Sequence, residues 1–270
     1  MTADMDMSII QPDILVQVKN KALPLKRIFG VLKDMLTDVN IEFGNQVVIE
    51  GTDPEKVAAT RLHLMHLEEY LCTEGDIRIG VYLSYLYKML RGVTYEHELE
   101  LVIHRSTPKV LEVTITHPSK NTRSFTAIKS IDIPHEIIEI PNDYHDATLT
   151  VSSKDFQKAI REATLISKRV CLGYRGDTLS VVASGNIGVC NVSIGCNDNL
   201  QTPVLEWHNR SNDSFAGLYF SKFIDKIIRP DISDTIDIYF TKGRPLIFQY
   251  SDKDFLGVFE FAVAEIPESN

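Results

Sequence analysis

The chain has 270 residues, an ordinary globular composition and a formal net charge of −9. This length allows one or two domains with a sizeable core, and the negative charge argues at first sight against a nucleic-acid partner. No apolar run approaches the roughly 18 residues that cross a bilayer. The N-terminus lacks the basic start and apolar middle of a secretory signal, so we expect a nuclear or cytosolic protein. The four cysteines form no CxxC pair, and we expect no metal site.

The first half of the chain predicts two amphipathic helices among short strands. Residues 1–15 are polar and predict a disordered extension, although residues 14–18 could form a first strand. A helix is predicted over residues 24–38, because apolar residues recur there at spacings of three and four while Lys26, Arg27 and Lys33 lie on the other side. A second helix over residues 82–91 directs Lys88 and Arg91 away from its leucines. Strands are predicted at 41–43, 47–49 and 57–64, within 68–79, and at 99–104, 110–116 and 124–133.

The second half repeats this pattern after a linker. Two prolines and mixed polarity break the periodicity between residues 133 and 145, where isoleucines are available to anchor the segment. A helix is predicted over 153–166, with Ser152 or Ser153 as its N-cap and with Lys158 and Arg161 facing outward. Another is predicted over 220–229 with Lys226 and Arg229 outward, and Pro230 ends it. Strand pairs are predicted around the turns at 175–177 and 184–186, and strands at 236–240, 246–250 and 255–263.

The recurrence of helix, strands, helix, strands with an offset of about 130 residues predicts an internal duplication. Because strands dominate and the helices are short, we expect an α+β fold in which each half has antiparallel sheets with two helices on one face. The expected organisation is a first domain over 1–133, a connecting linker over 134–145 and a second domain over 146–270.

The distribution of charge reverses the first impression given by the net charge. The four helical windows hold eleven of the 28 basic residues and five of the 37 acidic residues, a net +6, whereas the remaining chain has a net −15. A single basic helix face is usually a solvated surface. Four of them at matching places in two repeats favour contact with phosphates, and the absence of zinc spacing, of a recognition helix and of interleaved aromatic residues favours binding without sequence preference.

An enzyme is the first alternative, and the sequence argues against it. It contains no GxSxG, P-loop, GxGxxG or HExxH motif. Asp143, His145 and Asp146 form one cluster of acids with a histidine, but it falls in the predicted linker and is better explained as a solvated segment. We therefore expect no catalytic residue and no cofactor.

Several segments, taken in order, carry a family resemblance: LKRIFGVLKDML, VVIEGTDPEKVAATRLHL, IRIGVYLSYLYKMLRG, IDIPHEIIEIPNDY, DFQKAIREATLIS, LSVVASGNIGVCNVSI and GRPLIFQY. Together they resemble the proliferating cell nuclear antigen (PCNA) family of DNA sliding clamps over residues 22–266. The resemblance implies a homotrimeric ring that encircles double-stranded DNA in the nucleus, or at a cytoplasmic replication site if the source is a virus. It also implies a clamp loader, a DNA polymerase, and replication and repair proteins with a PCNA-interacting peptide as partners, and no membrane contact.

The resemblance implies three groups of site residues. The DNA-facing group is Lys26, Arg27, Lys33, Lys88, Arg91, Lys158, Arg161, Lys226 and Arg229. The partner-peptide pocket is Lys56, Val57, Ile138, Ile140, Pro141, Pro245, Val263 and Ala264. The subunit interface would join two edge strands, with Val110, Leu111, Val113 and Ile115 in one and Ile187, Val189, Val192 and Ile194 in the other.

Some features depart from the family pattern, and two alternatives stay open. Thr52 and Ala59 are smaller than the expected pocket residues, and Ala264 stands where a proline is usual. Ile138 and Ile140 could simply anchor the linker. The main alternative to a homotrimer is a monomeric or heteromeric clamp-like processivity or checkpoint subunit, in which the two edge strands would have different partners.

Overall fold

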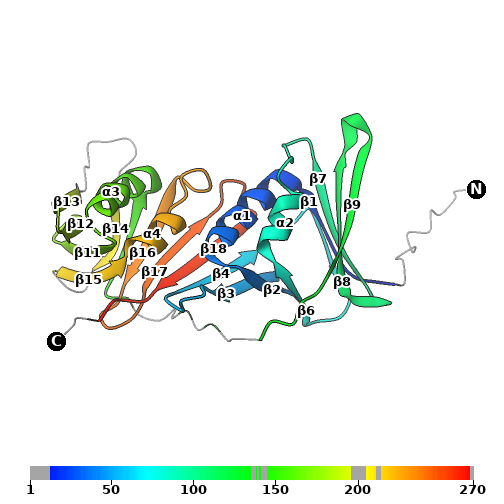
Figure 1. Cartoon of the computed structure of the whole chain (residues 1–270), viewed down its shortest axis with the longest axis horizontal. Coiled ribbons are helices and arrows are strands. Elements are labelled where there is room, and N and C mark those ends of the chain that lie inside the picture. The colour runs from blue at the N-terminus through cyan, green and yellow to red at the C-terminus, as the bar shows by residue number, and fades with distance from the viewer. Residues whose placement is uncertain are drawn as a thin grey trace, which may run out of the picture.

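Four α-helices lie on one side of three antiparallel sheets in the part of the chain that the structure describes (Figure 1). The computed structural model describes residues 13–134, 138, 140, 145–195, 205–210 and 214–267. The helices are α1 (Ala22–Met35), α2 (Leu83–Met89), α3 (Ser153–Ile166) and α4 (Ser221–Ile227). Each was expected from apolar spacing, and the α+β class is confirmed.

The largest sheet joins the two halves of the chain. Its order is β14 (Leu205–Arg210), β10 (Ala147–Ser152), β16 (Thr235–Phe240), β17 (Leu246–Ser251), β18 (Gly257–Val263), β4 (Ala58–Leu64), β3 (Val47–Thr52), β2 (Asp38–Phe43) and β6 (Ile77–Tyr82). Strand β18 pairs with β4 along its whole length. The predicted halves therefore share one continuous sheet.

Two smaller sheets lie at the two ends of the molecule (Figure 1). The first has the order β5 (Glu69–Cys72), β1 (Ile14–Lys21), β7 (Glu98–His104), β8 (Thr107–His117) and β9 (Thr122–Lys129), with the short helix η1 (Pro118–Lys120) between the last two. The second has the order β13 (Gly188–Gly195), β12 (Thr178–Gly185), β11 (Arg169–Arg175) and β15 (Ser214–Phe220). Strands β9 and β13 are thus outer strands at opposite ends of the molecule.

The structure corrects the prediction at the N-terminus and adds three strands. Strand β1 begins at Ile14, and Leu15 is buried, so the last two residues of the expected extension belong to the sheet. Residues 1–12 lie outside the described residues. Strands β10, β14 and β15 were not predicted. Strands β14 and β15 alternate incompletely, whereas β10 alternates at every position and could have been recognised from its sequence.

Two equivalent loops support the internal duplication. Asp53, between β3 and β4, accepts a hydrogen bond at 2.6 Å from the backbone N–H of Ala58, five residues later. Asp252, between β17 and β18, accepts one at 2.6 Å from Gly257, also five residues later. Both aspartates are at least nine-tenths buried, at 2% and 4% exposure. The same side chain thus shapes the same turn in each half.

The strands that follow these loops are also equivalent. The N–H of Ala264, just after β18, donates to the Val57 carbonyl at 2.8 Å, and the N–H of Met65, just after β4, donates to the Leu256 carbonyl at 2.9 Å. These matched contacts at the two ends of the β4–β18 pair give it an approximate local two-fold symmetry. The duplication therefore extends to the junction between the halves.

Helix formation follows from caps and burial. Helix α3 begins after Ser152, whose hydroxyl accepts from the N–H of Asp155 at 3.4 Å, as the sequence suggested. Helix α1 buries eight residues, including Leu25, Ile28 and Phe29, and leaves its charged residues on the other side. Because all four helices bury one stripe against the sheets, their outward faces lie on a common side of the molecule (Figure 1).

Candidate nucleic-acid interface and partner pocket

All nine predicted DNA-facing residues belong to a helix or lie within two residues of its end. Lys26, Arg27 and Lys33 lie in α1, Lys88 in α2, Lys158 and Arg161 in α3, and Lys226 in α4, whereas Arg91 and Arg229 follow α2 and α4. Six of the nine are exposed, and Lys26, Lys33 and Arg229 are half-buried. The structure thus places all nine residues on the helical side, but three of the side chains are less accessible to DNA than the other six.

Lys26 is engaged by the backbone that follows α2. Its Nζ donates to the carbonyl oxygens of Arg91 at 2.8 Å and Val93 at 3.0 Å. A cation is favourable there, because the carbonyl groups at a helix C-terminus have no partner within the helix. Lys26 therefore connects α1 to the end of α2.

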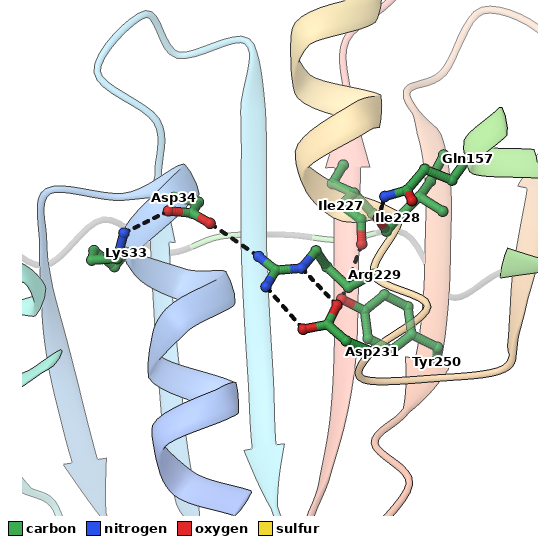
Figure 2. A network of polar contacts seen from close by, with 8 residues as sticks. All are labelled: Lys33, Asp34, Gln157, Ile227, Ile228, Arg229, Asp231 and Tyr250. Atoms are coloured by element: carbon green, nitrogen blue, oxygen red, sulfur yellow. Dashed lines mark hydrogen bonds and ion pairs between the residues drawn. The ribbon is translucent and has the colours of Figure 1, made fainter. Parts of the chain in front are cut away.

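Arg229 is engaged by carboxylates from both halves (Figure 2). Its guanidinium donates to Asp231 at 3.0 and 3.1 Å and to Asp34 of α1 at 3.0 Å, and Asp34 also accepts from Lys33 at 2.7 Å. The hydrogen bond to Asp231 raises the pKa of Arg229 and lowers the pKa of Asp231. Arg229 was expected to face DNA; its side chain is only 24% exposed and contributes instead to the junction between α1 and α4.

The same junction contains two hydrogen bonds to carbonyl groups at the end of α4 (Figure 2). The Tyr250 hydroxyl donates to the Ile227 carbonyl at 3.1 Å, and Gln157 Nε2 donates to the Ile228 carbonyl at 2.7 Å. Burial raises the pKa of Tyr250, which therefore stays protonated and able to donate. These bonds satisfy groups that the helix itself leaves unpaired.

The remaining basic residues differ in their pairing. Arg27 lies 3.3 Å from Asp254, and Arg161 lies 3.1 Å from Asp225. Among the described residues, by contrast, Lys88, Arg91 and Lys226 have no carboxylate partner within 4.0 Å, and neither has Lys154 of α3, which the site prediction left out. Lys158 is 78% exposed, and its ion pair with Glu162 is long, at 4.0 Å. These five side chains are the ones best placed to exchange contacts with phosphates.

Helix α2 and the residue just before it, Tyr82, also expose aromatic side chains, which the sequence analysis did not recognise. Tyr82 and Tyr85 are 42% and 57% exposed, and the Nζ of Lys88 lies 5.4 Å from the centre of the Tyr85 ring. The expectation that the basic face lacks interleaved aromatic residues was therefore wrong for α2. A repeat of Tyr and Lys at a spacing of three was the available signal.

The first predicted interface strand is not an edge strand. Residues 110–116 belong to β8, which pairs with β7 on one side and β9 on the other. Leu111 and Val113 are buried in the core, and Val110 and Ile115 lie beside them in the same interior strand. The apolar alternation of this segment indicates that one of its faces is buried, but it does not indicate whether the strand has a partner on one side or on both.

Strand β9 is an edge strand of this sheet instead. In the described structure it pairs only with β8, and its residues are exposed apart from Ile128, with Phe125 at 56%. At the other end β13 pairs only with β12 and, with the turn before it, exposes Val189 at 69% and Ile187 at 77%, while Val192 is half-buried and Ile194 is buried. Two strands with unpaired backbone groups and exposed apolar side chains thus lie at opposite ends of one molecule (Figure 1).

The predicted pocket residues fall into two places. Ile138 and Ile140 of the linker are 7% and 6% exposed and pack on the sheet against Ile247 and Ala262. Arg61 of β4, which lies 3.2 Å from Glu50 and 3.7 Å from Glu260, donates a hydrogen bond to the Ile138 carbonyl. Linker anchoring therefore accounts for both isoleucines.

A separate pocket of about 430 Å³ contains two of the predicted residues, Pro245 and Ala264. Its other lining residues are Gly243, Arg244, Glu265, Ile266 and Pro267. The half-buried Val57 adjoins it through its hydrogen bond to Ala264, and Lys56 is exposed in the preceding turn. Val263 was expected in the pocket but is fully buried in the core, because alternate residues of β18 face opposite sides of the sheet. Pro141 lies outside the described residues.

Thr52 lines a smaller hollow, separate from this pocket. This space of about 180 Å³ also contacts Asp38, Glu50, Ile133 and Ile138. Shortly before the linker, the N–H of Ile131 donates to the carbonyl oxygen of Gly80 in β6 at 3.0 Å. A Cβ at Gly80 would clash with the Ile131 carbonyl oxygen, so this close approach requires glycine.

Neither a metal centre nor a membrane segment is found in the described part of the chain. No group of three or more His, Cys, Asp and Glu residues there could hold a metal ion. None of the helices described above is long and apolar enough to cross a membrane. Two similar halves with antiparallel sheets and helices on one common side define the DNA-clamp fold.

Comparisons with known proteins agree with this class. The N-terminal domain of proliferating cell nuclear antigen matches residues 15–137, and its C-terminal domain matches residues 139–266. A relative named "Probable DNA polymerase sliding clamp 1" from Paramecium bursaria Chlorella virus 1 is 26% identical over 90% of this chain and 93% of its own length. The proliferating cell nuclear antigens of Chaetomium thermophilum and Saccharomyces cerevisiae are each 24% identical, over 84% and 88% of this chain and 88% and 93% of their own lengths.

The chain belongs to the proliferating cell nuclear antigen family of sliding clamps. Members of this family are processivity factors without enzymatic activity, and this chain is accordingly not an enzyme.

Proposed function

We propose that three copies of this chain close into a ring around duplex DNA and tether DNA polymerase and other partners. The observation that carries this proposal is the one-sided arrangement of the four helices, because it collects exposed basic side chains on one face of an otherwise acidic protein. Weakly paired cations such as Lys88, Lys158 and Lys226 would exchange phosphates readily, which sliding requires. The acidic remainder would keep DNA away from other surfaces.

Ring closure is supported by two of the edge strands, β9 and β13, which lie at opposite ends of the molecule. Strand β9 of one subunit and β13 of the next would satisfy each other's unpaired backbone groups and cover Phe125 and Val189. Because the two edges differ, the contact is head-to-tail, and such contacts give rings when the rotation closes. The proposed interface therefore uses β9 in place of the predicted β8 segment, together with the predicted β13 residues.

Partner recruitment is proposed at the pocket beside the C-terminal segment. Pro245, Ala264, Ile266 and Pro267 offer an apolar surface, and Ile138 and Ile140 pack on the same sheet. A peptide with an aliphatic or aromatic anchor suits such a hollow. Clients and a clamp loader would bind there, and the relatives named above suggest a nuclear or viral site of DNA replication.

The molar mass of the chain in solution tests the proposal. Light scattering behind a sizing column, over a series of dilutions, should give three times the subunit mass of 30.5 kDa. A single-subunit mass at every concentration would contradict the homotrimer and favour the monomeric or heteromeric alternative. A trimer that fails to bind duplex DNA at low salt would contradict the DNA-facing role of the helices.

A further inference from the structure

The exposed rings of α2 lie beside cations on the helical side of the molecule. The ring centres of Tyr82 and Tyr85 are 5.7 Å apart with perpendicular planes, and the Lys88 ammonium lies over the Tyr85 ring. Leu83 and Leu86, on the other side of α2, are fully buried. The two tyrosines are therefore not needed to fill the core.

This concentration of aromatic surface is local. The described residues include five exposed Phe, Trp or Tyr side chains, and two of them, Tyr82 and Tyr85, lie at the start of α2 with their rings in contact, while a third, Tyr95, follows six residues after the helix ends. Lys33 of α1 lies 4.9 Å from the ring of a fourth tyrosine, Tyr87, so α2 takes part in two cation–π contacts. Helix α3, which presents comparable charges, exposes no aromatic ring along Ser153–Ile166.

Phosphate contact alone does not account for exposed rings. In duplex DNA the faces of the bases are covered by their neighbours, so a tyrosine ring has no base face to contact. Unpaired bases expose their faces, and proteins bind them by combining aromatic rings with a positively charged path for the backbone. Tyr82 and Tyr85 could supply such rings, and Lys88 with Arg91 could supply the charge.

We propose that the outward face of α2 is a contact surface for single-stranded DNA adjoining the duplex, with Tyr85 stacking on an unpaired base. The proposal rests on the DNA-facing role of the helices and adds to it a preference for one structural form of DNA. A ring that encloses the end of a duplex region would meet both forms at once. Tyr85 would then bias its position toward that boundary without reading sequence.

The proposal is tested by substitutions of Tyr85 that remove either the hydroxyl group alone or the whole aromatic ring while keeping an apolar side chain. The affinities of wild type, Tyr85→Phe and Tyr85→Leu for a fluorescent single-stranded oligonucleotide and for a duplex of the same length should be measured by anisotropy at one ionic strength. We expect Tyr85→Leu to weaken single-strand binding about 10-fold. Tyr85→Phe should retain it within about twofold, because the ring persists, and duplex affinity should change by less than about twofold in both.

Phe255→Leu is the matched control, because Phe255 is also an exposed aromatic residue, at 71%, but lies in the loop between β17 and β18. It should leave both affinities unchanged. Equal losses in Tyr85→Phe and Tyr85→Leu would overturn stacking in favour of a hydroxyl contact with phosphate. Wild-type single-strand affinity in Tyr85→Leu would overturn the inference alone, whereas a wild-type protein that binds neither DNA form would overturn the proposed function as well.

Discussion

At the scale of residues, the structure separates basic side chains that stabilise the fold from those available to DNA. Arg229 is the clearest case of the first kind, because its guanidinium connects Asp34 of α1 to Asp231 after α4 (Figure 2). Spacing along a helix predicts which side a residue faces, but it does not reveal a carboxylate 195 positions away in the sequence. Both kinds of residue consequently look alike in the sequence.

We expect Arg229→Met to lower the free energy of unfolding at pH 7 by about 1–2 kcal/mol, because it leaves Asp34 and Asp231 without their shared partner. Arg229 lowers the pKa of Asp231 in the folded state. This stabilisation is therefore present above the unfolded pKa of about 3.9 and is lost as the pH falls through the folded value. Denaturant titrations at fixed subunit concentration should show the difference from wild type shrinking on acidification. A difference that is constant with pH would contradict this account.

Lys26 and Lys226 test the same distinction between basic residues that stabilise the fold and those that are available to DNA. Lys26→Gln should lower the free energy of unfolding by about 1–2 kcal/mol, because its ammonium donates to the Arg91 and Val93 carbonyls. Lys226→Gln should stay within about 0.5 kcal/mol of wild type, since Lys226 is exposed on α4. Lys226→Gln should instead make the plot of the logarithm of the duplex binding constant against the logarithm of the salt concentration less steep. The slope should fall by about one unit for each phosphate that the protein no longer neutralises. The reverse pattern in melting and binding measurements would show that the two roles are assigned wrongly.

At the scale of elements, local pattern predicts helices well and strand partners poorly. The four helices were found from apolar stripes, because each stripe is contained within one short segment. The position of β8 in its sheet depends on β9, and the joining of the halves depends on β4 meeting β18, which is nearly 200 residues away. Periodicity reports which face of a strand is buried but not which strands flank it. The interface was therefore assigned to the wrong neighbour.

The corrected edge leads to a prediction about Phe125 of β9. This side chain is 56% exposed in the single chain and would be covered by β13 of the next subunit. Phe125→Ala should therefore shift the mass at a given dilution from three subunits toward one, with the α-helical and β-sheet content unchanged in circular dichroism. Phe255→Ala is the control, because it removes an exposed phenylalanine from a loop far from both ends of the molecule (Figure 1). A dissociating control, or a Phe125 variant that remains trimeric, would argue against β9 as the interface.

At the scale of the whole molecule, charge and topology have complementary roles in the proposed mechanism. The helical windows have a net charge of +6 and the remaining chain −15, so attraction to DNA is confined to one side of each subunit. Attraction alone would give a protein that dissociates readily as salt is raised. A closed ring can use weak contacts and still remain on DNA, because it leaves only over an end or by opening.

Topological retention can be measured without a loader on duplex DNA that is tethered at one end. Rings should thread over the free end, and blocking that end with a bulky protein should then lengthen their residence time, even at salt concentrations that weaken phosphate contacts. Phe125→Ala should lose this effect of the block while retaining its basic helical side. Lys226→Gln should retain the effect, because the ring would remain closed. Equal residence times of the wild-type chain on open and blocked DNA would mean that it binds duplex from one side without encircling it.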